Sequence, residues 1–215
     1  MNHLKQFDKS FLTKKVKHLA GVDEAGRGPL AGPVVAAAVI FDKKTFHEKI
    51  NDSKKIAEPR REELYEWIVG NCIAYGIGII DHMEIDEINI LQASLKAMKI
   101  AALQLEPLPS LILIDGNKSF LSEIKSTTVV KGDAKSFSIA AASIIAKVTR
   151  DKIMKEYAGR FPHYGWEHNK GYATKEHIAA IKKLGATELH RKTFLNNILS
   201  GSQEEIIFKT VQNIY

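Results

Sequence analysis

Three short apolar segments of this chain each run into acidic residues at a glycine-containing turn, and this pattern constrains the fold more than any other feature. The segments are residues 19–23, 111–114 and 127–130, and the acids that end or follow them are Asp23, Glu24, Asp115 and Asp133. Short apolar or β-branched runs bounded by glycine turns are typical of buried strands. Since strand ends can meet at one edge of a sheet, we expect an α/β fold in which these carboxylates converge.

The remaining pattern predicts further strands and helices around these segments. A continuous apolar run over residues 33–41 and an alternating run over residues 72–80 predict two more strands. Apolar residues at helical spacing predict helices over residues 58–69, 84–105, 136–158, 175–184 and 204–214, and residues 161–172 are expected to form an aromatic loop. We therefore predict one compact core over residues 1–158 and a C-terminal helical extension over residues 159–215.

Composition narrows the class of protein. Lys and Arg total 31 against 25 acidic residues, and the resulting charge of +6 fits a polyanionic partner without identifying one. The single cysteine, Cys72, rules out an intramolecular disulfide and a cysteine-rich metal site. The longest uncharged stretch, residues 28–41, contains two prolines and is too short to cross a bilayer. We expect a cytoplasmic, monomeric protein with no membrane partner.

A cluster of four carboxylates implies a particular chemistry. Like charges a few ångströms apart raise one another's pKa, and hard cations such as Mg²⁺ or Mn²⁺ relieve the repulsion through oxygen ligands. Two such ions about 4 Å apart can activate a water and stabilise a leaving oxygen, as in phosphodiester hydrolysis. The alternative is that Asp115 and Asp133 are ordinary turn residues, because Asp-Gly and Gly-Asp are common turn dipeptides.

The glycine-rich segment after the acidic pair has two interpretations. Gly26-Arg27-Gly28, with Gly32, resembles a dinucleotide-binding fingerprint, but the third glycine is one position late and a proline and a β-branched run follow where a helix should begin. A backbone that approaches its ligand closely fits the segment better, and a plain tight turn is the alternative.

Other polar positions are ambiguous in the same way. Ser53 and Lys54 can reach backbone phosphates or form a solvated loop. Tyr172 can stack on a sugar or base, or pack before a helix. Four of the eight histidines lie in the C-terminal part of the chain, lack metal-ligand spacing and are interpreted as loop, surface or capping residues; they are His163, His168, His177 and His190.

At these positions the chain resembles ribonuclease HII, the type 2 ribonuclease H. The matching segments are residues 21–35, 51–54, 114–117, 131–136 with 144–151, and 170–172 with His177. The resemblance implies a ribonuclease H-like fold, with a mixed central sheet flanked by helices and a C-terminal helical extension. The short segment before Asp23 favours type 2 over the related type 3 enzymes.

The resemblance also implies an activity and a set of roles. Family members cut the RNA strand of RNA–DNA hybrids and nick on the 5′ side of ribonucleotides embedded in duplex DNA, leaving 3′-hydroxyl and 5′-phosphate ends. By position, the metal-binding and catalytic acids are Asp23, Glu24, Asp115 and Asp133, and the substrate-binding residues are Gly26, Arg27, Gly28, Ser53, Lys54 and Tyr172. The cofactor implied is Mg²⁺ or Mn²⁺ in a two-metal mechanism.

Two other functions remain as alternatives. A nucleic-acid binding module without catalysis would use the same basic loops for salt-dependent affinity. A nicotinamide-dependent oxidoreductase would use the glycine segment and bind NADH.

Overall fold

A mixed five-stranded sheet forms the centre of the molecule in the computed structural model, which describes residues 3–196 and 198. Its spatial order is β3-β2-β1-β4-β5. The strands are β1 (Leu19–Ala25), β2 (Val34–Ile40), β3 (Ala74–Ile80), β4 (Leu111–Asp115) and β5 (Ser126–Val129). The first three strands pair antiparallel, whereas β1, β4 and β5 pair parallel. All five predicted strands are present, with shifts of one or two residues at their ends.

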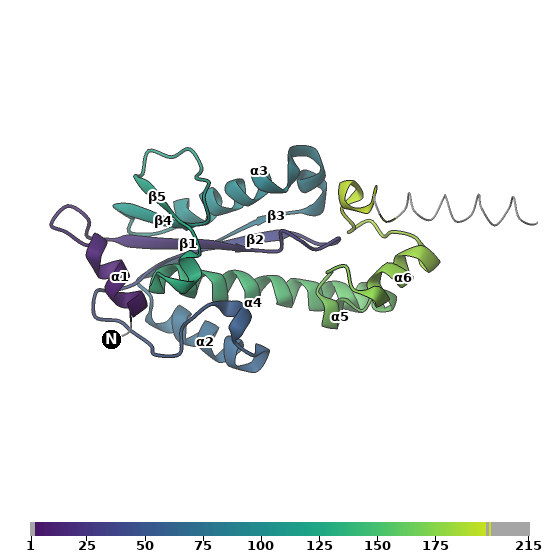
Figure 1. Cartoon of the computed structure of the whole chain (residues 1–215), viewed down its shortest axis with the longest axis horizontal. Coiled ribbons are helices and arrows are strands. Elements are labelled where there is room, and N and C mark those ends of the chain that lie inside the picture. Colours follow the sequence, from purple (N-terminus) through teal and green to yellow (C-terminus); the bar gives the residue numbers. More distant parts are fainter. Residues whose placement is uncertain (1–2, 197, 199–215) are drawn as a thin grey trace, which may run out of the picture.

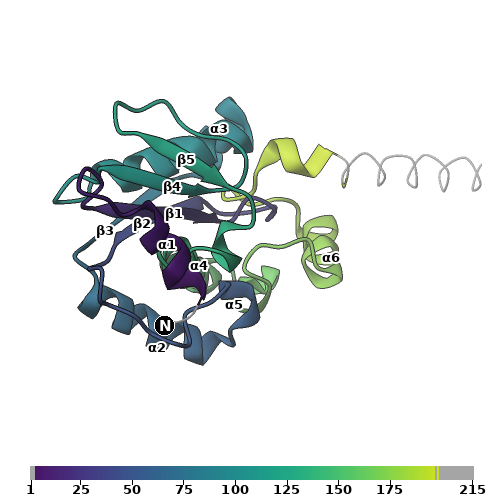
Figure 2. The same cartoon turned by 60° about the vertical axis from the view of Figure 1, so that its left-hand side comes forward.

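Helices cover both faces of the sheet (Figure 1). One face is covered by α3 and the other by α4, with α2 packed against α4. At one end, which is turned toward the viewer in Figure 2, α1 contacts α4, and at the other end lie α5 and α6 (Figure 1). The helices are α1 (His3–Phe11), α2 (Glu58–Asn71), α3 (His82–Leu103), α4 (Phe137–Arg160), α5 (Trp166–Asn169) and α6 (Lys175–Leu184), with 3₁₀ turns η1 (Ser53–Lys55), η2 (Gly132–Ala134) and η3 (Pro162–Tyr164).

The continuous apolar run of β2 is explained by burial of both faces of this strand. All seven of its residues are buried. The residues Val34, Ala36, Ala38 and Ile40 join the hydrophobic cluster against α3, while Ala37 and Val39 join the cluster against α2 and α4. Because side chains alternate between the faces of a strand, a strand sandwiched by two helical layers must be apolar at every position.

The contact between β1 and α4 depends on Gly21. A Cβ atom at this position would lie 2.2 Å from the carbonyl carbon of Ser138 and 2.3 Å from the nitrogen of Ile139. Only glycine therefore allows the first turn of α4 to lie directly on β1. Asp23 is two residues further along the same face of the strand, so this close packing brings α4 alongside the first acid.

The structure corrects three of the sequence-based assignments. α1 was not predicted; its Asp8 is buried and accepts hydrogen bonds from Ser136 and Ser138 at the start of α4. The helix predicted over residues 84–105 is interrupted at Asn89, whose side-chain oxygen accepts from two following backbone N–H groups and so begins a new helical segment. The predicted loop over 161–172 contains η3 and α5.

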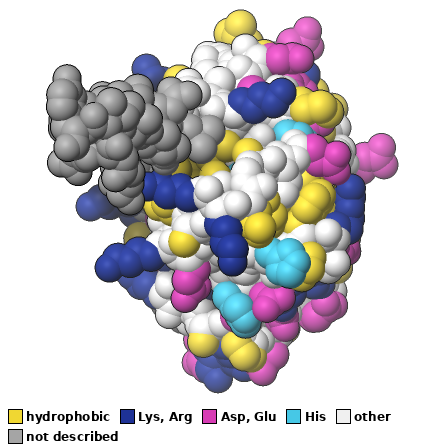
Figure 3. Space-filling model, turned by 90° about the vertical axis from the view of Figure 1, so that its right-hand side faces the viewer, with side chains coloured by type: hydrophobic (Ala, Val, Ile, Leu, Met, Phe, Trp, Pro, Cys, Tyr) yellow, Lys and Arg dark blue, Asp and Glu magenta, His cyan; other side chains and the backbone are white. Residues whose placement is uncertain are grey.

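The C-terminal elements pack on the end of the core through a separate hydrophobic cluster. Leu30 and Ala31, from the loop between β1 and β2, meet Met154 of α4 and Trp166 of α5 there. On this face of the molecule Lys and Arg side chains stand among acidic, histidine and hydrophobic ones (Figure 3). The predicted division at residue 158 remains a prediction, and the predicted helix over 204–214 lies outside the described residues. In the described part of the chain, every helix is too short or too polar to cross a membrane.

Candidate active site

Asp23 and Glu24 lie next to each other in β1 and face opposite sides of the sheet. Asp23 lines a cavity together with Ser143 and Lys147 of α4. Glu24 lines this cavity and also an adjoining one that is bounded on the other side by residues of α3, including Ser94. The acidic pair therefore marks the place where the sheet ends between its two helical layers.

Asp115 lies beside Asp23 because β1 and β4 are parallel neighbours. Val22 pairs with Ile114 in this ladder, so the next residue on each strand emerges at the same edge and on the same face. Asp115 lines both cavities. The parallel register thus brings together two acids that are far apart in the sequence.

Asp133 lies in η2, directly after β5 and the left-handed residue Lys131, whose φ is 57°. Its position is fixed through its neighbour, because the N–H of Gly132 donates to Oδ1 of Asp115 at 2.6 Å. Asp133 is outside the lining of both cavities, but its charge acts on Asp23. The four predicted acids are therefore gathered at one end of the sheet, with Asp133 the most peripheral.

Crowding and burial shift the protonation of this cluster. Burial, followed by the charges of Glu24 and Asp115, raises the pKa of Asp23 well above its usual range. Burial also raises the pKa of Glu24, despite an ion pair of 3.2 Å between its Oε1 and Nη1 of Arg27. Burial and the charge of Asp115 raise the pKa of Asp133. Such a cluster is stabilised by any added positive charge.

The carboxylate oxygens of the four acids are suitable ligands for a hard divalent cation, although these side chains are not arranged around a common centre. Among residues 3–196 and 198, no group of three or more His, Cys, Asp or Glu side chains is placed to hold a metal ion. Oε2 of Glu24 is buried and lacks a hydrogen-bond partner among these residues, so one carboxylate oxygen is already desolvated and available. Carboxylate oxygens are the ligands that Mg²⁺ and Mn²⁺ prefer.

The glycine loop borders the same cavity. Gly26, Arg27 and Gly28 all line it, and a Cβ atom on Gly28 would lie 3.6 Å from the ring of Tyr172. The chain continues from this loop into the antiparallel strand β2, and no helix begins there. A dinucleotide fingerprint needs a helix whose N-terminus faces the pyrophosphate, so that alternative loses its structural basis.

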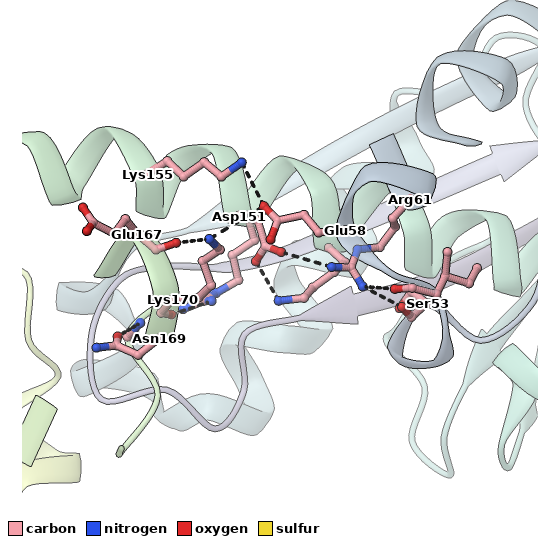
Figure 4. Close-up of polar contacts among 12 residues, drawn as sticks. Ser53, Glu58, Arg61, Asp151, Lys155, Glu167, Asn169 and Lys170 are labelled. Atoms are coloured by element: carbon pink, nitrogen blue, oxygen red, sulfur yellow. Dashed lines mark hydrogen bonds and ion pairs between the residues drawn. The ribbon is translucent and has the colours of Figure 1, made fainter. Parts of the chain in front are cut away.

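The loop with Ser53 and Lys54 forms another part of the cavity wall, and its backbone is held by Arg61 of α2. Nη1 of Arg61 donates to the carbonyl oxygens of Ser53 at 2.7 Å and Ile56 at 2.8 Å (Figure 4). Partial burial alone would lower the pKa of Lys54, but the carboxylates of the site outweigh this effect and raise it. The Lys54 ammonium therefore stays charged beside the acids.

An ion-pair network supports this wall from α4 (Figure 4). Oδ1 of Asp151 lies 2.6 Å from Nζ of Lys147, and Oδ2 lies 3.8 Å from Nη2 of Arg61. Farther along, Glu58 of α2 pairs with Lys155 at 2.8 Å. These contacts fasten α2, and with it the loop over 53–56, to α4.

Sequence reasoning missed two polar residues of the cavity, Ser143 and Lys147. Their spacing of four residues in a helix otherwise rich in Ala and Ile, with Asp151 four residues further, was the signal that could have found them. Lys147 also lies 6.0 Å from the ring centroid of Tyr172, which is 43% exposed. The predicted substrate-binding residues and the predicted acids thus share one cavity, except for Asp133.

The histidine interpretation needs correction at His177, and His190 is a buried loop residue. His177 and His190 are buried, with exposures of 0% and 1%, and their Nε2 atoms lie 3.1 Å apart. They form part of the C-terminal packing beside Trp166, so neither is a surface residue; His177 lies in α6, whereas His190 does lie in the loop after it.

Comparison with known proteins identifies the family. A sequence model described as Ribonuclease HII matches residues 20–197, which is most of the chain. The chain belongs to the ribonuclease HII family. It is therefore a type 2 ribonuclease H, an endonuclease. The ribonuclease HII of Caldanaerobacter subterraneus subsp. tengcongensis is 52% identical over 94% of this chain and 83% of its own length. That of Endomicrobium trichonymphae is 50% identical over 93% of this chain and 97% of its own length.

Solved structures agree with the fold. The ribonuclease H2 of Pyrococcus horikoshii OT3 superposes with a TM-score of 0.71 at 27% identity, covering 84% of this chain and 96% of that one. Bst-RNase HIII, solved in complex with Mn²⁺, has a TM-score of 0.64 at 16% identity and covers 89% of this chain and 72% of its own. The expected ribonuclease H-like fold is confirmed.

Proposed function

We propose that this ribonuclease HII is a divalent-metal-dependent enzyme that cuts the RNA strand of RNA–DNA hybrids and nicks on the 5′ side of ribonucleotides embedded in duplex DNA. The products are 3′-hydroxyl and 5′-phosphate ends, and the cellular role is ribonucleotide removal from DNA. We further propose that it acts as a monomer in the cytoplasm.

One observation carries the proposal. Three acids, a lysine and a glycine loop with exposed backbone line the same cavity, namely Asp23, Glu24, Asp115, Lys54 and residues 26–28. A cation site and an anion site therefore adjoin, as a phosphodiester bound through metal ions requires. The desolvated oxygen of Glu24 supports metal binding at this place.

The proposed roles follow from these positions. Asp23 precedes Glu24 in β1 and neighbours Asp115 across the β1–β4 ladder, and it would be the acid shared between ions, with Asp133 completing the set from η2. When bound, the two ions would supply an activated water and stabilise the leaving oxygen. Lys54 and the Ser53 backbone would hold the phosphate, which orients the scissile bond against the acids.

Ribose recognition is assigned to the backbone of the glycine loop, residues 26–28. The 2′-hydroxyl distinguishes RNA from DNA at a single nucleotide, and peptide groups of residues 26–28 can bond it without reading the base. Tyr172 is exposed next to Gly28 and would stack on the neighbouring nucleotide.

A cleavage assay with one ribonucleotide in an end-labelled DNA duplex tests the proposal. We expect a single nick with Mg²⁺ or Mn²⁺, no nick with EDTA, and no nick in the all-DNA duplex. Asp23→Asn should remain folded and lose nearly all cleavage, because an amide is a poor ligand for a hard cation.

Glu156→Gln is the matched control, since Glu156 is exposed on α4 and lines neither acidic cavity. Binding of the duplex without any nick would favour the non-catalytic alternative instead. Full activity of Asp23→Asn would refute the assignment of the acids.

A further inference from the structure

Two arginine side chains behind the glycine loop, Arg150 of α4 and Arg191, are both fully buried, at 0% exposure. The hydrogen bonds of both guanidinium groups, within residues 3–196 and 198, go to carbonyl oxygens of the backbone. A buried charge without a carboxylate partner is costly. The burial of two such arginines therefore suggests that their hydrogen bonds serve a purpose other than core packing.

The acceptors of the two arginines belong mainly to one segment. Arg191 donates to Gly26 at 2.7 Å, to Arg27 at 3.1 Å and to Gly32 at 2.9 and 3.0 Å. Arg150 donates to Ala31 at 3.1 Å, Pro33 at 3.0 Å and Lys170 at 2.9 Å. We call these two side chains the arginine bracket. The arginine bracket therefore binds the backbone carbonyl groups of residues 26–33 from the buried side of the loop.

The carbonyl groups of Gly26 and Arg27 fix the direction of the N–H groups that follow them, those of Arg27 and Gly28. In a trans peptide the C=O and the following N–H point in opposite directions. Because the carbonyls of Gly26 and Arg27 both point at Arg191, the N–H groups of Arg27 and Gly28 point away from it. Neither N–H has an acceptor in the described part of the chain, and both residues are exposed at the cavity. The loop therefore presents two free donors outward.

The glycines of the loop are matched to this arrangement. Gly26 has φ +101°, and a Cβ atom on it would lie 2.2 Å from Nε of Arg150 and 2.7 Å from the carbonyl oxygen of Pro33. Gly28, by contrast, meets only the Tyr172 ring at 3.6 Å. One glycine makes room for the bracket behind the loop, and the other leaves room for a ligand in front of it.

We propose that Arg191, supported by Arg150, is a positioning residue for ribose discrimination: it orients the peptide planes of residues 26–28 so that the Arg27 and Gly28 N–H groups face the ribose 2′-hydroxyl. This inference rests on the proposed function and extends it to residues that touch no substrate. Burial lowers the pKa of Arg191 to about 9, and the side chain stays protonated at neutral pH. The arginine bracket thus holds the loop in one conformation before the substrate binds. This reduces the entropic cost of ordering the loop on binding.

The test is binding without cleavage. Arg191→Lys keeps a positive charge but cannot reach three carbonyl groups at once. Affinity is measured in EDTA for a duplex with one ribonucleotide and for the same duplex made only of DNA. We expect the ratio of the two affinities to fall about tenfold, as for the loss of one or two neutral hydrogen bonds, with binding of the all-DNA duplex unchanged.

Arg160→Lys is the matched control, because Arg160 is exposed and pairs with Glu188 at the surface. It should leave the ratio unchanged. If Arg191→Lys weakens both duplexes equally, or keeps the wild-type ratio, the positioning role is refuted. Cleavage by the wild-type protein is measured in parallel with a divalent metal. Absence of cleavage would refute the proposed function, whereas an unchanged affinity ratio in Arg191→Lys would refute only the role of Arg191.

A second measurement covers the case in which Arg191→Lys does not fold. In the ¹⁵N-labelled wild-type protein, the amide signals of Arg27 and Gly28 should shift with the ribonucleotide duplex and shift less with the all-DNA duplex. Equal shifts with both duplexes, or none, would overturn the proposal.

Discussion

The backbone N–H of Gly132 donates a 2.6 Å hydrogen bond to Oδ1 of Asp115, which ties the end of β4 to the turn that carries Asp133. A side chain at Gly132 would crowd this contact. A Cβ atom on Gly132 would lie 3.1 Å from Oδ1 of Asp115 and 2.6 Å from Cδ1 of Ile139. The spacing between two acids of the site therefore depends on a residue that carries no chemistry.

Gly132→Ala should lower kcat/KM while the protein stays folded. The added methyl group pushes the turn away from Asp115, and a shift of about 1 Å in an active site can reduce the rate about 100-fold. Steady-state cleavage of a one-ribonucleotide duplex measures the loss, with circular dichroism as the check on folding. Gly159→Ala is the control, because a Cβ atom there meets nothing within 4 Å. Equal activity of the two variants would contradict the prediction.

Asp23→Asn should increase stability even though it abolishes cleavage. Burial and the neighbouring carboxylates raise the pKa of Asp23, so its ionised form destabilises the folded state. For an acid with a raised pKa in the folded state, stability is lost as the pH rises, so the gain of the variant should be larger at alkaline than at acidic pH. Thermal melts in EDTA across this range measure the gain.

Adding Mg²⁺ should reverse the order of the two proteins. A bound cation stabilises the crowded wild-type carboxylates, whereas the variant has lost one ligand. If Mg²⁺ raises the melting temperature of both proteins equally, Asp23 is not a metal ligand.

Arg61→Lys should raise KM several-fold with little change in kcat. Arg61 holds the carbonyl groups of Ser53 and Ile56 from behind, and a lysine cannot bond both in the same geometry. The loop that presents Lys54 then becomes less ordered, which weakens phosphate binding more than it changes the acids. Arg60→Lys, at the neighbouring half-buried position whose side chain pairs with Glu63 on the same helix, is expected to behave as wild type. A fall in kcat alone would show that Arg61 acts on the acids instead.

The buried pair His177 and His190 should make the fold sensitive to mild acid. Trp166 donates to Nε2 of His177 at 3.0 Å, so His177 carries its proton on Nδ1, which lies 2.9 Å from the Tyr172 carbonyl oxygen. His190 then donates from its own Nε2 to His177, and its Nδ1 accepts from the Thr187 N–H at 2.9 Å. Each ring is neutral in this network, and a further proton on either removes an acceptor.

Stability should therefore fall as the pH drops below the usual histidine value of 6.5. Burial lowers the pKa of both rings, and for His190, with the charge of His177, to about 4. Between these values the unfolded chain takes up protons that the folded chain excludes, so stability is fully present above about pH 6.5 and declines toward pH 4. One ring contributes a slope of at most about 1.4 kcal/mol per pH unit.

Urea unfolding at several pH values measures this slope. His190→Gln should flatten it, because glutamine does not titrate. His163→Gln, at an exposed position, should keep the wild-type dependence. A slope that is unchanged in His190→Gln would show that the pair is not the acid-sensitive element.

Residue type and periodicity were sufficient for the strands and for most of the helices, and they placed the acids at strand ends. A strand between two helical layers, such as β2, must be apolar throughout, and Asp115 ends the apolar strand β4, so local sequence carries that information. The same holds for Gly26 to Gly28, since close backbone approach requires glycine. These features were predicted because each depends on residues within a few positions of one another.

Tertiary structure decided what depends on distant residues. Asp115 meets Asp23 only through the parallel register of β1 and β4, and Arg191 reaches Gly26 across 165 positions of sequence. The role of α1, whose Asp8 holds the start of α4, was invisible for the same reason. Contacts of this kind are set by packing of the whole sheet, and no local pattern records them.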